Sequence, residues 1–333
     1  MFSRFKLDPF LLLLFATLAF ATFLPAKGDA AIGFDWLTNA GIVLLFFLHG
    51  AKLSRSAVVA GLGAWHLHLM VLATTFVIFP LLGLGITTAL GPWLNPAIVA
   101  GFLFLCIVPS TVQSSIAMTA MAHGNVSAAV CSASLSNVLG IVFTPVLAAI
   151  LLNGGSADSS FFLDALVKIG GTLLLPFIVG HLMRPVIGSF IDRHKTLVGR
   201  TDRGVILLVV YTAFSAAVVE GLWSRFDIGD LATILLLDAV LLAIVLMLSR
   251  LMARLTRQPH EDEAVLVFCG SKKSLASGVP IAGAMFEPAQ VGVMVLPLML
   301  YHQMQLIVCA ALAQAYARRY AATLENKRET LHA

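Results

Sequence analysis

Long apolar segments recur along the whole chain, and they constrain its fold more than any other feature. A helix needs about 20 mainly apolar residues to cross the hydrocarbon core of a bilayer. Segments of roughly that length cover residues 8–25, 35–52, 66–88, 95–122, 125–151, 161–183, 203–220, 230–252, 262–285 and 289–318. They are continuously apolar instead of alternating, which predicts helices rather than the strands of a barrel. The sequence therefore predicts an all-α integral membrane protein with ten transmembrane helices.

Charged residues are too few to cover a soluble protein of this size. The 333 residues include 21 Lys and Arg and 17 Asp and Glu, and 59% are hydrophobic, whereas soluble domains carry about 25% charged residues. This composition excludes a soluble enzyme, a nucleic-acid binder and a disordered chain. The sequence has no zinc-protease, nucleophile-elbow or phosphate-loop motif, and its four cysteines lie in apolar segments without metal-ligand spacing. We therefore expect that the protein is not an enzyme and that it has neither a metal site nor a resident cofactor.

The positive charges predict how the helices are oriented in the membrane. With ten spans, 16 of the 21 Lys and Arg residues fall on one side, and two, Lys27 and Arg225, fall in loops on the other side. Because basic residues accumulate in cytoplasmic loops, we expect both termini in the cytoplasm of a protein of the inner or plasma membrane, with 320–333 as a cytoplasmic tail. The first segment has the basic start of a signal peptide, but a clean Ala-x-Ala cleavage site is missing, which favours a retained helix.

A charged connection near the centre of the chain, residues 184–203, separates five apolar segments from five. An odd number of helices in each half places the two halves in opposite orientations, which is the arrangement of an inverted repeat in secondary transporters. We therefore predict one transmembrane domain over 1–333, with one repeat over about 8–152 and a second over about 161–319.

The fourth segment of each half is interrupted by small and polar residues at corresponding places. The first interruption reads Pro-Ser-Thr-Val-Gln-Ser-Ser (109–115), and the second reads Gly-Ser-Lys-Lys-Ser (270–274), followed by Ala-Ser-Gly-Val-Pro (276–280). A break inside the membrane frees backbone N–H and C=O groups that lipid cannot satisfy, so such breaks typically line a binding site. The alternative is a proline kink whose free groups are bonded by Ser and Thr hydroxyls.

Polar residues in and around the interruptions form the predicted substrate or ion pathway. They come from the two interruptions and from the fifth and tenth segments: Ser110, Thr111, Gln113, Ser114, Ser115, Asn137, Ser271, Lys272, Lys273, Ser274, His302 and Gln303. Hydroxyl and amide side chains also hold helices together. We favour this packing role for the serines of the fifth segment, and both roles stay open for His302 and Gln303.

Lys272 and Lys273 are the residues on which the functional hypothesis depends. A charge at the bilayer centre costs about 2.5–3.5 kcal/mol on insertion scales, and neighbours on a helix point in different directions, so at least one lysine should face the interior. Its ammonium group would bind an anionic group or take the place of a coupling cation. Alternatively, the lysines form a buried pair with an acidic residue, and Asp238 in the eighth segment is the candidate partner.

Four motifs carry a family resemblance that covers nearly the whole chain. They are Leu-Asp-Pro-Phe (7–10), Leu-Leu-Phe-Phe-Leu-His-Gly-Ala-Lys-Leu-Ser (44–54), Pro-Ser-Thr-Val-Gln-Ser-Ser (109–115) and Gly-Ser-Lys-Lys-Ser-Leu-Ala-Ser-Gly-Val-Pro (270–280). In combination they resemble the bile acid:sodium symporter superfamily, in the SBF-like branch that includes bacterial sodium-dependent transporters and vertebrate solute carrier family 10 member 7. The resemblance implies two inverted five-helix repeats, a panel and a core domain, and broken fourth and ninth helices that cross near the midplane. It also implies a solute carrier, with organic anions as the best-known substrates of the family.

Several positions depart from the pattern of the bile acid symporters. By resemblance, their Ser-Asn pair on the fourth helix corresponds to Ser115-Ile116, their Ser and Thr ligands on the fifth helix to Ala129 and Ala133, and their Glu and Gln-Asn on the ninth helix to Phe268 and Lys272-Lys273. Most of the oxygen ligands for sodium are therefore missing, and coupling to sodium, to protons or to neither stays open.

These observations predict a secondary transporter of a small organic anion that works by alternating access around the two interruptions. The alternative is a non-transporting membrane regulator or scaffold with the same fold, which would need no solvated cavity at the midplane. A dry, fully packed crossing of the broken helices would favour that alternative.

Overall fold

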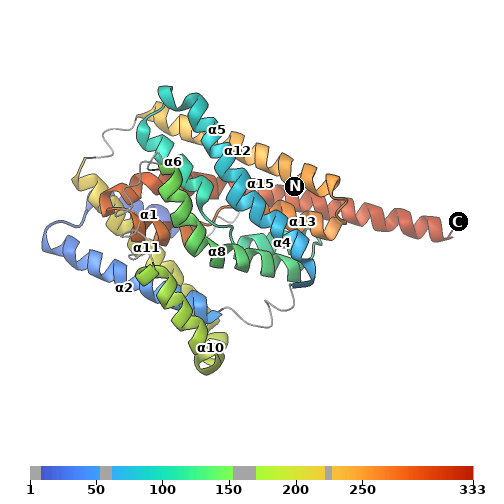
Figure 1. The fold of residues 1–333 in the computed structure, drawn as a ribbon, viewed down its shortest axis with the longest axis horizontal. Coiled ribbons are helices and arrows are strands. Elements are labelled where there is room, and N and C mark those ends of the chain that lie inside the picture. Colours follow the sequence, from blue (N-terminus) through green and yellow to red (C-terminus); the bar gives the residue numbers. More distant parts are fainter. Residues whose placement is uncertain (1–8, 53–61, 153–169, 222–226, 333) are drawn as a thin grey trace. The chain divides into compact units, whose positions relative to one another are not determined.

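A computed structural model of the protein describes residues 9–52, 62–152, 170–221 and 227–332. These residues form helices joined by short connections (Figure 1), and none of them lies in a β-strand. The prediction of an all-α protein is confirmed. Residues 161–169, with which the predicted second repeat begins, lie outside the described residues, as do four of the basic residues used to predict the orientation, Arg4, Lys6, Arg55 and Arg225.

The helices follow the predicted apolar segments along the chain. In order, they are α1 (Pro9–Phe23), α2 (Asp29–Lys52), the 3-10 turn η1 (Leu62–Ala64), α4 (Trp65–Ala73), the π-helical turn η2 (Thr74–Ile78), α5 (Phe79–Leu90), the 3-10 turn η3 (Gly91–Trp93), α6 (Pro96–Ile107), α7 (Gln113–Met121), α8 (Val126–Leu152), the π-helical turn η4 (Gly170–Leu174), α10 (Leu175–Arg193), α11 (Lys195–Val219), α12 (Ile228–Leu255), α13 (His260–Gly270), α14 (Leu275–Met285) and α15 (Pro288–His332).

Seven helical stretches in the described part of the chain are long and apolar enough to cross a membrane. They are Asp29–Lys52, Trp65–Trp93, Val126–Leu152, Gly170–Arg193, Lys195–Val219, Ile228–Leu255 and Pro288–Thr323, and two shorter apolar helices are Leu12–Phe23 and Pro96–Ile107. The protein is therefore a multi-pass membrane protein. The count of ten spans and the inverted repeats stay predictions.

Large apolar side chains remain exposed on the outside of these helices. Phe23 is 83% exposed, Trp36 is 76% exposed and Trp93 is 78% exposed. Water would make such a surface unfavourable, whereas lipid tails cover it without cost, and tryptophans are enriched where the tails meet the headgroups.

Two helices continue beyond their predicted ends. We predicted that the sixth segment would end at residue 183, but α10 reaches Arg193 through Pro185. We also predicted that the tenth segment would end at residue 318, but α15 reaches His332 and includes most of the predicted tail. Apolarity locates only the part of a helix inside lipid, while residues with high helix propensity, such as Ala, Glu, Lys and Arg, extend it into water.

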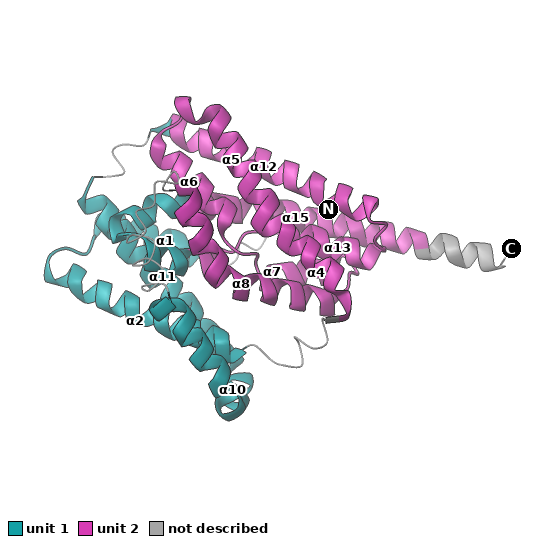
Figure 2. Ribbon diagram, viewed as in Figure 1, with its two compact units in different colours: residues 1–53, 157–228, 279–296 teal, residues 54–156, 229–278, 297–333 magenta. Residues whose placement is uncertain are grey.

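The chain divides into two compact units, which Figure 2 shows in teal and magenta. Unit 1 contains residues 1–53, 157–228 and 279–296, and unit 2 contains residues 54–156, 229–278 and 297–333. Each unit takes segments from both predicted repeats, so the compact units are not the repeats.

In unit 1, α2 and α10 approach each other closely at two glycines. A Cβ atom on Gly50 would lie 1.9 Å from the carbonyl oxygen of Phe177, and one on Gly180 would lie 2.0 Å from the carbonyl oxygen of Phe47. Neither position has room for a side chain, which is how small residues allow membrane helices to pack backbone against backbone.

In unit 2, α4, α8 and α13 share one apolar core. Leu67 and Val71 of α4 pack with Ala129 of α8 and with Val265 and Leu266 of α13, and all five are buried. This core holds the last turn of α13 beside α8, and it therefore positions the second interruption, which follows α13.

Candidate functional site

Both predicted interruptions are present, and they lie against each other in unit 2. α6 ends at Ile107 and α7 begins at Gln113, while α13 ends at Gly270 and α14 begins at Leu275. The Ser274 N–H donates to the carbonyl oxygen of Pro109 at 2.8 Å, and the Ser110 hydroxyl donates to the carbonyl oxygen of Cys269 at 2.5 Å. Each interruption thus satisfies a main-chain acceptor of the other.

Local sequence explains where the helices stop and restart. Val108 is extended, with φ −72° and ψ 155°, as expected for the residue before a proline, whose ring disfavours the helical region. In the second interruption, the Ser274 hydroxyl accepts the N–H of Ser277 at 3.1 Å, the bond by which a serine caps the start of a helix, here α14.

Polar residues of α8 satisfy the main chain that the first interruption frees. The Ser110 N–H donates to the Ser136 hydroxyl at 3.1 Å, and the Asn137 amide donates to the Ser110 carbonyl oxygen at 2.8 Å. The Asn137 amide oxygen also accepts the hydroxyl of Ser277 at 2.5 Å. Asn137, a predicted site residue, therefore connects the two interruptions, and Ser136 supports the first interruption from the same helix.

Lys273 lies where the two interruptions meet, and all three donors of its ammonium group form hydrogen bonds. Its ammonium group donates to the carbonyl oxygens of Thr75 at 2.9 Å, Cys106 at 2.8 Å and Val108 at 2.9 Å, which accounts for the three donors of an ammonium group. The ammonium nitrogen also lies 4.0 Å from the centroid of the Phe79 ring. The side chain is fully buried, so Lys273 has no donor left for a solute.

The acceptor at Thr75 is free because the helix changes register at η2. The Phe79 N–H bonds the Thr74 carbonyl oxygen, five residues back, instead of Thr75. In the same register the partner of Thr75 would be residue 80, which is Pro80 and has no N–H. The sequence Thr-Thr-Phe-Val-Ile-Phe-Pro (74–80) thus leaves a main-chain oxygen open for Lys273.

Lys272 is also fully buried, but its ammonium group is only partly used. It donates to the Ser114 carbonyl oxygen at 2.9 Å, and it lies 5.9 Å from the centroid of the Phe268 ring. Of its three donors, the described residues accept one in a hydrogen bond. Lys272 therefore differs from Lys273 in having one described hydrogen-bond acceptor instead of three.

The alternative in which Asp238 pairs with the lysines has no hydrogen bond or ion pair behind it among the described residues. Asp238 on α12 is fully buried, yet neither of its carboxylate oxygens has a hydrogen-bond partner. The two ion pairs among the described residues, Lys52–Asp202 and Arg184–Asp192, lie in unit 1. The lysines bond main-chain carbonyl oxygens instead, because the first interruption and the π-helical turn η2 leave such acceptors open where the ammonium groups reach.

The remaining predicted residues of the first interruption and of the start of α7 form a short hydroxyl chain close to Ser114, whose carbonyl oxygen Lys272 bonds. The Thr111 and Ser115 hydroxyls lie 2.7 Å apart, and the Ser114 hydroxyl donates to that of Thr111 at 2.8 Å. Gln113 is exposed on the same helix. The Ser271 hydroxyl bonds back to the Val267 carbonyl oxygen at 2.6 Å, so it acts within its own helix end.

On α15, Gln305 bonds the second interruption, although it was not among the predicted site residues. The Gln305 side chain accepts the N–H of Lys273 and donates to its carbonyl oxygen, both at 2.8 Å. His302 Nδ1 lies 2.8 Å from the Gln305 amide nitrogen and 3.2 Å from the Lys273 carbonyl oxygen, whereas Gln303 makes no hydrogen bond within this network. Tyr301 donates its hydroxyl to the Ser271 carbonyl oxygen at 2.8 Å. The helical spacing of Tyr301, His302 and Gln305 places them on one face and was the available signal.

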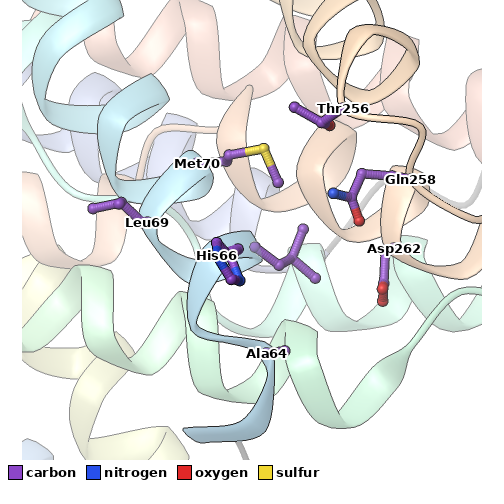
Figure 3. A pocket seen from close by; sticks show the side chains of 8 residues that line it. Ala64, His66, Leu69, Met70, Thr256, Gln258 and Asp262 are labelled. Atoms are coloured by element: carbon purple, nitrogen blue, oxygen red, sulfur yellow. The ribbon is translucent and has the colours of Figure 1, made fainter.

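A separate hollow of about 520 Å³ lies elsewhere in unit 2, and Figure 3 shows the side chains that line it. Its lining comes from α4 and its preceding turn, from the connection between α12 and α13, and from the start of α13: Ala64, His66, Leu67, Leu69, Met70, Thr256, Gln258 and Asp262. None of the predicted site residues lines it, so this hollow and the meeting of the interruptions are two different places.

Known proteins support the transporter prediction. The model of the SBF-like CPA transporter family matches residues 8–318. The chain is 54% identical over 316 residues to the uncharacterized protein PA2026 of Pseudomonas aeruginosa, with 95% of each chain covered. It is 51% identical over 313 residues to the Escherichia coli protein named "Putative symporter YfeH", with 94% of each covered. It is 25% identical over 320 residues to sodium/bile acid cotransporter 7 of Danio rerio. This match covers 93% of the present chain and 94% of the relative.

These names describe transporters and not enzymes, and they confirm the resemblance drawn from the four motifs. The motif at 270–280 that carries the resemblance is the segment in which Lys272 and Lys273 meet the first interruption. With a family model that matches nearly its whole length, the chain belongs to the SBF-like CPA transporter family.

Proposed function

We propose that the protein is a secondary transporter that carries a small organic anion by alternating access at the two interruptions, and that Lys272 binds the anion. The observation that carries this proposal is the partly used ammonium group of Lys272, which has one carbonyl partner among the described residues. An anionic carboxylate or sulfonate supplies the acceptors that the other donors need. The helix starts at Gln113 and Leu275 add positive dipole ends close to the same place.

Lys273 has a different part in the proposal. Three carbonyl oxygens around one positive charge are the kind of ligand set that channels and transporters present to a cation. The ammonium group of Lys273 occupies this set and so takes the place of a bound cation. It stabilises the contact between the interruptions without a free ion, which agrees with the loss of the family's sodium ligands at Ala129, Ala133 and Phe268.

The proposed location is the inner or plasma membrane, with both termini in the cytoplasm. The distribution of Lys and Arg supports this orientation. Because the Danio rerio relative is named a sodium/bile acid cotransporter, a bile acid such as taurocholate is the first member of the anion panel.

Uptake into proteoliposomes tests the transport proposal. The panel includes taurocholate, a dicarboxylate and an organic sulfonate, and uptake is driven by a sodium gradient and by a proton gradient in separate arms. We expect uptake of at least one anion, with Lys272→Gln reducing the apparent affinity at least tenfold. Lys195→Gln, which changes an exposed lysine of α11, is the matched control. If neither Lys272→Gln nor Lys273→Gln changes anion uptake, the lysines do not recognise the substrate.

The alternative is a non-transporting regulator or scaffold, and one observation favours it. Both lysines, Ser110 and Ser115 are fully buried, so the meeting of the interruptions is packed in the described structure. A transporter must open this place to water during its cycle, whereas a scaffold need not. Ser115→Cys in membranes, probed with an impermeant thiol reagent, separates the two: labelling above the wild-type background supports the transporter, and background labelling supports the scaffold.

A further inference from the structure

Asp238 is a buried carboxyl group that nothing in the proposed anion site uses. It lies on α12 in unit 2, it is fully buried, and neither oxygen has a hydrogen-bond partner. The main chain of Tyr301 on α15 faces it without meeting hydrogen-bond geometry. Acidic side chains are almost never fully buried unless they are paired, so this group needs an explanation.

An ionised carboxylate without a partner is one of the least favourable groups in an apolar interior, while the protonated acid is neutral and costs far less. A metal ion does not supply the missing charge, because it needs several ligands, and the described residues contain no cluster of His, Cys, Asp and Glu that could hold one. A single proton neutralises Asp238 without any further ligand.

The neighbours of Asp238 connect it to the two interruptions. Its titratable neighbours are Cys106 on α6 and Tyr301 on α15. The Cys106 carbonyl oxygen accepts a hydrogen bond from Lys273, and the Tyr301 hydroxyl donates to Ser271. The fields of both Asp238 and Lys273 reach the Cys106 thiol, so a charge on Asp238 acts on a residue that Lys273 holds by a hydrogen bond.

We propose that Asp238 carries a proton in the described structure and that release of this proton is coupled to the opening of the two interruptions. The step is balanced: the carboxylic O–H bond breaks, the proton leaves to water, and the carboxylate keeps the electron pair. The new negative charge acts on Cys106 and Tyr301, and it disturbs the hydrogen bonds by which these two residues hold Lys273 and Ser271 of the second interruption. The coupling rests on the proposed transport function and assigns it the proton as coupling ion.

Infrared difference spectroscopy of the purified full-length protein tests the protonated state without any substrate. We expect the carbonyl stretch of a protonated carboxylic acid at neutral pH, absent from Asp238→Asn and retained in Asp227→Asn, which changes an exposed carboxylate just before α12. If the wild-type and Asp238→Asn spectra agree in this region, Asp238 is not protonated and the proposal is overturned. This result does not depend on whether the protein transports anything.

Transport tests the coupling, with taurocholate as the probe. Under an inward proton gradient of one pH unit, one proton carried with each monovalent anion supports about a tenfold accumulation. We expect the wild-type protein to approach this tenfold accumulation of taurocholate, and Asp238→Asn to give no proton-driven accumulation. At equal pH on both sides, Asp238→Asn should still exchange internal for external taurocholate. Proton-driven accumulation by Asp238→Asn would overturn the coupling. Failure of wild type to transport taurocholate or any other anion of the panel would overturn the proposed function, and the coupling with it, while the infrared result on protonation would stand.

Discussion

The ammonium group of Lys273 donates a hydrogen bond of 2.9 Å to the carbonyl oxygen of Thr75, 198 residues earlier in the chain. The oxygen is available because the π-helical turn η2 shifts the register and because Pro80 brings no N–H to the position that would otherwise bond it. A helix defect on one segment and a lysine in the break of another segment thus satisfy each other. Two predictions follow directly from this relationship.

Replacing Lys273 by methionine should destabilise the protein strongly. The change leaves the carbonyl oxygens of Thr75, Cys106 and Val108 buried without their donor, and each unsatisfied group costs about 1–3 kcal/mol. We expect a loss of about 3 kcal/mol or more in the free energy of unfolding, read as a lower melting temperature in detergent. Lys272→Met, which removes one such bond, should cost clearly less, and equal losses for the two lysines would contradict the carbonyl arrangement.

Replacing Pro80 by alanine should partly rescue Lys273→Met. Alanine brings an N–H that the Thr75 carbonyl oxygen can accept when the ammonium group is gone. In a double-mutant cycle, we expect Lys273→Met to cost about 1 kcal/mol less in the Pro80→Ala background than in wild type. An equal cost in both backgrounds, measured by the same melting assay, would show that Thr75 does not depend on Lys273.

Replacing Gln305 by alanine should cost much more stability than replacing Gln303, although the two residues are only two positions apart on α15. Gln305 bonds both the N–H and the carbonyl oxygen of Lys273, and Gln303 is outside that network. We expect Gln305→Ala to lose about 2 kcal/mol of stability, the sum of two hydrogen bonds of ordinary strength, and Gln303→Ala to lose little. The comparison of their melting temperatures is the measurement, and a larger effect at Gln303 would refute the network.

The glycine contact between α2 and α10 should not tolerate a methyl group. Gly50→Ala would place a Cβ 1.9 Å from the Phe177 carbonyl oxygen, and such overpacking typically costs about 1–3 kcal/mol. Gly33→Ala on the same helix is the control, because a Cβ there meets nothing within 4 Å and alanine favours a helix over glycine. We expect Gly50→Ala, but not Gly33→Ala, to lower the melting temperature. Unchanged stability of Gly50→Ala would mean that α2 and α10 are not in backbone contact.

The positions of the two interruptions could be read from the sequence because their causes are local. Pro109 and the small, polar residues around it stop α6, and Ser274 caps α14. The roles of the two lysines could not be read in this way. Neighbouring lysines look alike in a sequence, and what separates them is the number of carbonyl oxygens that other segments bring to each.

The same reason explains why the sequence left the Asp238 pairing open and why Gln305 was not among the predicted site residues. Charge alone offered a buried acid as one possible partner for a buried lysine. The ammonium groups instead bond main-chain oxygens, and the residue types in a sequence do not show which of these oxygens are available. Helical spacing placed Tyr301, His302 and Gln305 on one face of α15, but it did not say which face meets the second interruption.

The sequence by itself determined that this protein is an α-helical membrane protein with two interrupted helices, because lipid demands long apolar segments and because prolines and small polar residues act on their own neighbourhood. Only the tertiary structure decided that the Lys273 ammonium group has three hydrogen-bond acceptors, that the Lys272 ammonium group has one, and that neither Asp238 oxygen has a hydrogen-bond partner. These properties depend on which main-chain oxygens of α4 to α7 meet residues 270–274, and a linear sequence of side chains does not contain that geometry.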